Sequence, residues 1–267
     1  MTTLGRIVAR TRERVEQKRR EVPLDRVLAV APTPGAHRQF SASISRPGAY
    51  NVIAEFKRRS PSRGIIREDL HPVYVAQGYE IAGAAALSIL TEEEFFAGSL
   101  DDLQQARQAT LLPTLRKDFI IDPIQVYEAR MVGAAAILLI VRALTDGQLT
   151  GLSTLARQVG LETLVEVHSE AELERAVALR PDMIGVNARD LDTLVMDPWL
   201  VAALLPKVPP DIVAVAESGL KTREDVERVA SLGADAVLVG TAVAGAEDPG
   251  EALKALVGVP KTRRVSE

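Results

Sequence analysis

Short apolar runs that alternate with helical patterns constrain the fold of this chain more than any other feature. Eight such runs occur, at residues 52–56, 85–90, 112–116, 136–141, 163–167, 183–186, 212–216 and 236–239. They are continuous in Val, Ile, Leu and Ala, as strands that are buried on both faces require. Helical patterns lie between them, for example at residues 123–132, 170–179 and 223–232. We therefore predict a parallel sheet whose strands are joined by right-handed helical crossovers.

The number of these units favours a closed barrel. Three helical patterns lead into the next strand through similar phrases, in which a glycine ends the helix and alanines permit close packing on the sheet. The phrases are Gly83-Ala84-Ala85-Ala86, Gly133-Ala134-Ala135-Ala136 and Gly233-Ala234-Asp235-Ala236. Eight units without a spare strand predict an α/β fold, a (β/α)8 TIM barrel. An open dinucleotide-binding sheet is disfavoured, because no Gly-x-Gly-x-x-Gly turn follows an early strand.

The segment before the first apolar run is predicted to be helical. Residues 2–30 carry a sparse apolar stripe and oppositely charged pairs at i,i+3 spacing, such as Lys18 and Glu21. Prolines then interrupt the pattern, and a short helical segment is expected at residues 37–45. We expect one structural domain, with an N-terminal helical extension at 1–48, the barrel at 49–258 and a C-terminal tail at 259–267.

The composition excludes several classes of function. The 267 residues contain 32 basic and 36 acidic side chains, and the net charge of −4 argues against nonspecific binding to nucleic acid. There is no cysteine, which excludes disulfides, thiolate metal sites and a cysteine nucleophile and suits a reducing compartment. The longest apolar run, at residues 134–141, is too short to cross a membrane. We therefore expect a cytoplasmic protein, a monomer or a homodimer, without nucleic-acid or membrane partners.

The segment at residues 51–64 places an acid and a base at the end of the first predicted strand. Side chains two residues apart in a strand point the same way, so Ile53, Glu55 and Lys57 share a face, with the two charges about 7 Å apart. A surface ion pair would explain this segment equally well on its own. Lysine is rare in this chain, and we interpret Lys57 and Lys117 as positions where a compact ammonium group is needed.

Similar side chains recur where other predicted strands end. Lys117, Glu166, Asn187 and Glu217 occupy such ends, and these ends meet at the mouth where barrel enzymes carry their active sites. Simple helix caps would be Gly, Asp or Ser, whereas buried lysines and glutamates cost free energy unless they are paired. We therefore predict a catalytic site at this mouth.

The last two predicted strands end in small residues that suit a phosphate group. Ser218 and Gly219 follow the seventh strand, and Gly240 and Thr241 follow the eighth. Barrels commonly bind phosphate at this place through backbone N–H groups, which glycine leaves accessible. Plain turn residues are the alternative interpretation. The occurrence of both pairs favours a phosphorylated small-molecule substrate.

The histidines give little support for a metal site. His37, His71 and His168 are dispersed and lack a metal-binding spacing. His37 and His71 are expected to face solvent or to cap a helix, whereas His168 follows the fifth strand closely enough to be considered for the site. We expect no metal.

Seven motifs follow one another along the chain: IAEFKRRSPSRG, LSILTEEEFFAGSLDDL, LRKDFIIDPIQVYEAR, LVEVH, IGVNARDLDTL, AESGL and GADAVLVG. In this order and spacing they resemble the indole-3-glycerol phosphate synthase family of tryptophan biosynthesis. The resemblance covers nearly the whole chain and includes a helical N-terminal extension over the barrel mouth. It implies a carboxy-lyase that converts 1-(2-carboxyphenylamino)-1-deoxyribulose 5-phosphate into indole-3-glycerol phosphate, carbon dioxide and water, without a metal or an organic cofactor.

The resemblance also implies roles for the charged residues at the strand ends. Lys117 is implied as the general acid that protonates the ribulose carbonyl oxygen during ring closure, and Glu166 as the general base of the dehydration. Lys57 is implied to bind an anionic group and to supply a later proton, and the division of labour between the two lysines stays open. Glu55 and Glu217 are implied to hold the lysines and to tune their pKa values.

Further candidates concern substrate binding. Asn187 is implied to hydrogen-bond a substrate hydroxyl, and the planar fork of Arg189 suits the substrate carboxylate. Phe96, Phe119 and Leu138 are candidates for walls around the aromatic ring, with core packing as an equal alternative for each.

The loop after Lys57 contains Ser60, a candidate substrate-binding residue, and three arginines. Arg58, Arg59 and Arg63 belong either to a closing lid or simply to a solvated surface. At the phosphate end, Thr241 departs from the family pattern, where a serine or glutamate is expected, which leaves the role of its hydroxyl open.

Two other functions remain as alternatives. One is another phosphate-binding barrel enzyme, such as phosphoribosylanthranilate isomerase or the tryptophan synthase α subunit, which need an acid-base carboxylate or thiol rather than two strand-end lysines. The other is a catalytically inactive barrel retained for binding or assembly, against which the complete set of charged residues argues.

Overall fold

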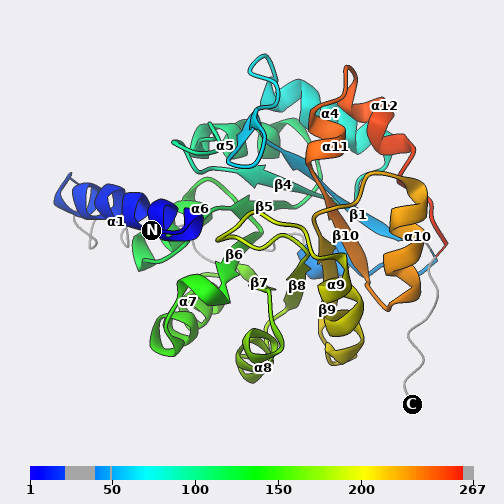
Figure 1. Cartoon of the computed structure of the whole chain (residues 1–267). Helices are drawn as coiled ribbons and strands as arrows, with labels where there is room; N and C mark the ends of the chain where they lie inside the picture. Colours follow the sequence, from blue (N-terminus) through cyan, green and yellow to red (C-terminus); the bar gives the residue numbers. More distant parts are fainter. Residues whose placement is uncertain (22–39, 49, 261–267) are drawn as a thin grey trace.

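The computed structural model describes residues 1–21, 40–48 and 50–260 of the chain. The end of the predicted N-terminal helix, at 22–30, lies outside the described residues, as do His37 and residues 261–267 of the predicted tail. Within the described ranges the chain forms a closed barrel of parallel strands with helices around it (Figure 1).

The predicted (β/α)8 barrel is confirmed. In barrel order the strands are β1 (Asn51–Phe56), β4 (Ala86–Leu90), β5 (Thr114–Lys117), β6 (Ala136–Ile140), β7 (Glu162–Val167), β8 (Met183–Asn187), β9 (Val213–Glu217) and β10 (Ala236–Val239). Neighbouring strands pair in parallel, and β10 pairs with β1 to close the ring. Each predicted apolar run overlaps one strand, because a strand between the barrel interior and the helices needs apolar side chains on both faces.

Helices on the outside connect the strands. They are α4 (Pro72–Ala82), α5 (Leu100–Ala109), α6 (Pro123–Met131), α7 (Asp146–Gln158), α8 (Glu170–Ala178), α9 (Pro198–Leu204), α10 (Arg223–Ser231), α11 (Thr241–Ala244) and α12 (Pro249–Lys254), with 3-10 turns η1 (Val141–Ala143) and η2 (Leu205–Lys207). Ser99, Asp122 and Ser169 cap three of them by accepting a hydrogen bond from a backbone N–H of the first turn. None of the described helices has the length and apolar character that a membrane span requires.

Two layers of apolar side chains form the core. One layer lies between the barrel and the outer helices, and the other fills the barrel interior, where Ile53, Leu115 and Val215 are fully buried. The two layers alternate along a strand, so that in β7 Leu164 joins the interior layer and Val165 the outer one. The aliphatic interior lies directly beneath the charged side chains at the strand ends and supports them.

The N-terminal helix α1 (Thr3–Glu21) lies against the rim of the barrel beside α6 (Figure 1). Leu4 joins the interior apolar cluster. Lys18 forms an ion pair with Glu128 of α6 rather than with Glu21, its predicted partner along the helix. The charges of α1 therefore attach it to the barrel, because the largely buried carboxylates of Glu128 in α6 and of Asp122, which caps α6, pair with Lys18 and Arg19.

The short helix α3 (Phe40–Ile44) closes the opposite end of the barrel. Phe40 and Ile44 are fully buried in the interior cluster. Ser41 donates hydrogen bonds from its backbone N–H and its hydroxyl to Glu162, the first residue of β7. The described part of the N-terminal extension therefore contacts both ends of the barrel.

Candidate active site

A cavity of about 740 Å³ opens at the C-terminal ends of the strands. Its size is in the range of small-molecule sites, and it occupies the mouth that the sequence predicted. It is lined by all the predicted site residues, which are Glu55, Lys57, Ser60, Phe96, Lys117, Phe119, Leu138, Glu166, Asn187, Arg189, Glu217, Ser218, Gly219, Gly240 and Thr241. The fold therefore brings these candidates together from every part of the barrel.

Four charged side chains form one layer across the barrel. Glu55, Lys117, Glu166 and Glu217 come from β1, β5, β7 and β9, which are alternate strands in the barrel order. Alternate strands direct side chains into the same interior layer, so residues far apart in the sequence meet. The three glutamates are at most 5% exposed. Charges that are buried so deeply need partners within the layer.

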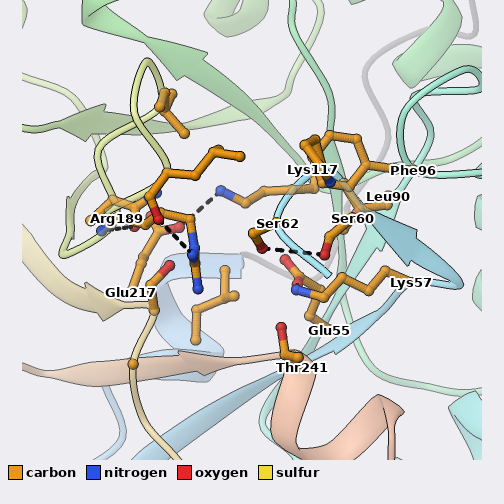
Figure 2. Close-up of a pocket in the computed structure, with 18 of the residues that line it drawn as sticks. Glu55, Lys57, Ser60, Ser62, Leu90, Phe96, Lys117, Arg189, Glu217 and Thr241 are labelled. Atoms are coloured by element: carbon orange, nitrogen blue, oxygen red, sulfur yellow. Dashed lines mark hydrogen bonds and ion pairs between the residues drawn. The ribbon is translucent and has the colours of Figure 1, made fainter. Parts of the chain in front are cut away.

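Lys117 lies at the centre of this layer. Its Nζ is 2.5 Å from Oε2 of Glu166 and 2.9 Å from Oε2 of Glu217. Figure 2 shows the side chain of Lys117 extending toward the side on which Glu217 lies. Burial alone would lower the pKa of Lys117, but the two carboxylates outweigh burial and raise that pKa above its ordinary value. Lys117 is therefore held as an ammonium ion that can donate a proton.

The two carboxylates beside Lys117 differ in their surroundings. Burial would raise the pKa of Glu166, but Lys117 and His168 lower it below its ordinary value. Burial also raises the pKa of Glu217; Lys117 opposes this, yet the charge of Glu166 adds to it and the pKa stays above the ordinary value. Asn187 donates a hydrogen bond of 3.1 Å to Oε1 of Glu166. Glu166 is therefore the more readily ionised carboxylate of the two, which is the state that a proton acceptor needs.

Lys57 makes a separate pair with Glu55. Its Nζ is 2.6 Å from Oε1 of Glu55, and Figure 2 shows the two groups side by side above Thr241. Gly240 makes room for this pair, because a Cβ at that position would lie 2.1 Å from Oε1 of Glu55. The mouth thus holds two ammonium groups, each already bound to carboxylate.

Aromatic and aliphatic side chains form one wall of the cavity. The rings of Phe96 and Phe119 have centroids 6.1 Å apart and a tilt of 37°, and Leu138 lies on the same lining. The backbone N–H of Phe96 donates to Glu92 at 3.2 Å, and Glu92 pairs with Arg14 of α1 at 2.8 Å. The wall is therefore connected through a buried carboxylate to the N-terminal helix.

The ends of β9 and β10 present backbone to the cavity. Ser218 and Gly219 both have positive φ, 67° and 77°. Such a value is uncommon for serine and often marks a functional site. Gly240 precedes α11, and Thr241 is its first residue. These four residues line the cavity where β9 and β10 end.

The loop after β1 forms a small hairpin that the sequence did not predict. β2 (Arg59–Ser60) pairs in antiparallel with β3 (Gly64–Ile65). Both terminal nitrogens of Arg58 lie 2.8 Å from the carboxylate oxygens of Asp102, so Arg58 is bound to α5 and is not simply solvated. The alternative that it belongs to a closing lid stays a prediction. A buried carboxylate in the first turn of α5 fixes this arginine. Arg63 lines the cavity.

His168 lies behind the cavity and does not line it. Its side chain is 1% exposed, with Nε2 3.3 Å from Oε1 of Glu166 and Nδ1 3.4 Å from Oε2 of Glu172. His71 is exposed at the start of α4, as expected. Across the described ranges, no group of three or more His, Cys, Asp or Glu side chains has an arrangement that could hold a metal ion.

Sequence reasoning missed several cavity residues. Lys221 directly follows the AESGL motif and lines the cavity, so extending that motif by one residue would have found it. Thr3 and Ile7 of α1 also line the cavity, but no sequence signal gives the packing of a separate helix against a barrel mouth. From β4 the lining residue is Leu90.

Comparisons with known proteins agree along nearly the whole chain. The family model described as indole-3-glycerol phosphate synthase matches residues 4–256. A relative from Polaromonas sp. with that name is 46% identical over 259 residues, covering 96% of this chain and 98% of the relative. A relative from Acidithiobacillus ferrooxidans with the same name is 44% identical over 256 residues, covering 95% and 97%.

Solved structures show a similar fold at low sequence identity. Thiamine phosphate pyrophosphorylase from Pyrococcus furiosus is 20% identical, with a TM-score of 0.58 over 77% of this chain and 93% of its own. N-acetylmannosamine-6-phosphate 2-epimerase from Clostridium perfringens is 16% identical, with a TM-score of 0.61 over 79% of this chain and 93% of its own. At these identities the likeness concerns the barrel fold alone.

Proposed function

Because this chain belongs to the indole-3-glycerol phosphate synthase family, we propose that it converts 1-(2-carboxyphenylamino)-1-deoxyribulose 5-phosphate into indole-3-glycerol phosphate, carbon dioxide and water. The observation that carries this proposal is the position of Lys117 between Glu166 and Glu217 in the cavity. The reaction needs a proton donor and a proton acceptor close together. An ammonium ion in contact with an ionised carboxylate supplies both.

Ring closure is the step that needs the proton donor. The ring carbon that bears the carboxylate attacks the ribulose carbonyl carbon, and the electron pair of the carbonyl moves onto its oxygen. Lys117 donates its proton to that oxygen, which becomes a hydroxyl group. The substrate carboxylate then leaves as carbon dioxide, and its bonding electrons restore the aromatic ring.

Dehydration needs both a base and an acid. Glu166 accepts the proton that the ring system loses, while an ammonium group protonates the departing hydroxyl so that it leaves as water. Lys57 is the candidate for that second donor, because its ammonium group lies on the same cavity as Lys117. Glu55 holds the ammonium group of Lys57 at 2.6 Å, and Glu217 holds that of Lys117 at 2.9 Å.

The remaining candidates divide between the two ends of the substrate. Phe96, Phe119 and Leu138 pack against the aromatic ring, and Arg189 and Ser60 bind polar groups beside it. At the other end, Ser218, Gly219, Gly240 and Thr241 bind the phosphate mainly through backbone N–H groups, so the change from the family pattern at Thr241 is tolerated. Asn187, which already donates to Glu166, also contacts a substrate hydroxyl.

Neither alternative is favoured by these findings. Another barrel enzyme of the same pathway would not account for the family match over residues 4–256. An inactive barrel would not need to keep Lys117 and its carboxylates buried in one layer at the cost of desolvating them.

Product formation from the proposed substrate tests this function. The intact protein is expected to form a fluorescent indole product, and Glu166→Gln is expected to reduce turnover by a factor of about 10² to 10⁴, as for loss of a general base. Glu170→Gln is a matched control on the surface of α8, where Glu170 pairs with exposed Lys207. Absence of product with the intact protein would contradict the proposal.

A further inference from the structure

A buried histidine outside the cavity is joined to the proposed base by a chain of charges. His168 directly follows β7, and its Nε2 lies 3.3 Å from Oε1 of Glu166. Its Nδ1 lies 3.4 Å from Oε2 of Glu172 on α8. Glu172 in turn accepts a hydrogen bond of 2.8 Å from Nε of Arg142 in η1. The imidazole therefore connects the carboxylate at the site with an outer ion pair.

The two carboxylates require both ring nitrogens of His168 to carry protons. A neutral imidazole has one N–H and one lone pair, so one nitrogen would direct its lone pair at a carboxylate. Both nitrogens are buried, and neither makes a hydrogen bond of standard geometry in the described structure. His168 therefore contacts Glu166 and Glu172 through ion pairs, as an imidazolium. Burial opposes the charge, yet Glu166 and Glu172 raise the pKa of His168 to about 9.

His168 breaks the symmetry between the two carboxylates that contact Lys117. Lys117 itself touches both of them, Glu166 at 2.5 Å and Glu217 at 2.9 Å. On the far side, Oε1 of Glu166 faces His168 and the amide of Asn187, whereas Oε1 of Glu217 makes no hydrogen bond within the described residues. A cation beside one carboxylate favours ionisation there over ionisation of its neighbour.

We propose that His168 is a positioning residue whose imidazolium keeps the negative charge on Glu166 rather than on Glu217. This inference rests on the proposed function, in which Glu166 is the general base. His168 acts through that carboxylate and touches no substrate. Glu172 on α8 contacts the other ring nitrogen of His168, and Arg142 pairs with Glu172 in turn. These two residues hold the imidazolium in place from outside the barrel.

The pH dependence of turnover separates this role from a merely structural one. The titratable groups that face Glu166 are Lys117 from β5, Glu217 from β9 and His168 itself. His168→Gln keeps a neutral donor but removes the cation, so the base gains its proton more easily. The acid limb of the kcat profile is then expected to move to higher pH by about one unit. An acid limb that stays in place would overturn the proposal.

Titration of the imidazole by NMR tests the same coupling without turnover. The chain has three histidines, so the signals can be assigned with single substitutions. His168 is expected to titrate well above an ordinary histidine and to fall toward the ordinary value in Glu166→Gln and in Glu172→Gln. Glu170→Gln is the matched control, since Glu170 is on the same helix but pairs with Lys207 at the surface. A titration near pH 6.5 in the intact protein, or one unchanged in Glu166→Gln, would overturn the inference.

Failure of the inference and failure of the proposed function give different results. If the intact protein forms no product, the function fails, whatever the imidazole does. If it forms product while His168→Gln leaves the acid limb unmoved, the function stands and the positioning role fails.

Discussion

At the scale of single residues, two glycines leave the space that the carboxylates of Glu217 and Glu55 occupy in the barrel. A Cβ at Gly185 would lie 2.0 Å from Oε1 of Glu217, and one at Gly240 would lie 2.1 Å from Oε1 of Glu55. Neither distance is possible for real atoms in contact, so any side chain there would displace the carboxylate. These glycines are therefore needed for space, and the charged layer depends on them.

Gly185→Ala tests this requirement. The added methyl group must push Glu217 away from Lys117, so we expect lower kcat and an unfolding free energy lower by about 1–3 kcal/mol, as in overpacked cores. Gly151→Ala is the matched control, because nothing lies within 4 Å of its Cβ position on α7. That variant is expected to be more stable by about 0.5–1 kcal/mol and fully active. Equal behaviour of the two variants in urea unfolding and turnover would contradict the packing argument.

The pKa of His168 also predicts how stability changes with pH. The pKa is raised from 6.5 to about 9 in the folded protein, so folding is favoured by the bound proton. The contribution is fully present below pH 6.5, is lost as the pH rises through 9, and amounts to about 3 kcal/mol. The difference in unfolding free energy between the intact protein and His168→Gln should therefore shrink from pH 6 to pH 9.5. If this difference stayed constant or grew, the pKa of His168 would not be raised in the folded protein.

At the scale of elements, α1 stabilises the aromatic wall through a buried carboxylate. Glu92 is fully buried and accepts hydrogen bonds from the backbone N–H groups of Phe95 and Phe96, at 2.6 and 3.2 Å. Arg14 of α1 is its ion-pair partner. The helix and the wall of the cavity are therefore linked by charge as well as by apolar packing.

Arg14→Met should disturb that wall. It leaves the carboxylate of Glu92 buried without its cation, so we expect a loss of about 1–3 kcal/mol in unfolding free energy and a higher KM. Arg12→Met changes an exposed residue of the same helix and is the control. Both quantities can be measured by urea unfolding and steady-state kinetics. If the two variants were indistinguishable, α1 would have no part in shaping the cavity.

The strands were predictable from the sequence, and the smaller elements were not. A strand buried on both faces leaves a continuous apolar run, which is why all eight runs correspond to strands. The hairpin of β2 and β3 leaves no such run, since each of its strands has two residues. The ion pair of Lys18 was also missed, because pairing across separate helices depends on tertiary packing.

At the scale of the whole molecule, the barrel explains why the site candidates could be found without a structure. Closure brings every C-terminal strand end to one mouth, so a charged residue at such an end is placed by topology alone. Lys57, Lys117 and Glu166 meet there for this reason. The order of the strands does not predict which charged side chains form ion pairs with one another. That Lys117 bridges two carboxylates and that His168 lies behind one of them follow from side-chain packing, which the sequence does not encode locally.

The central claim is that Lys117 supplies the proton for ring closure, and Lys117→Met tests it most directly. Turnover and the Kd of the substrate should be measured on the same preparation, since methionine keeps an unbranched side chain of nearly the same length and removes the ammonium group. We predict that kcat falls by a factor of about 10² to 10⁴ while the Kd changes much less, because the proton is needed in the transition state. Turnover that remains at the level of the intact protein would contradict the account.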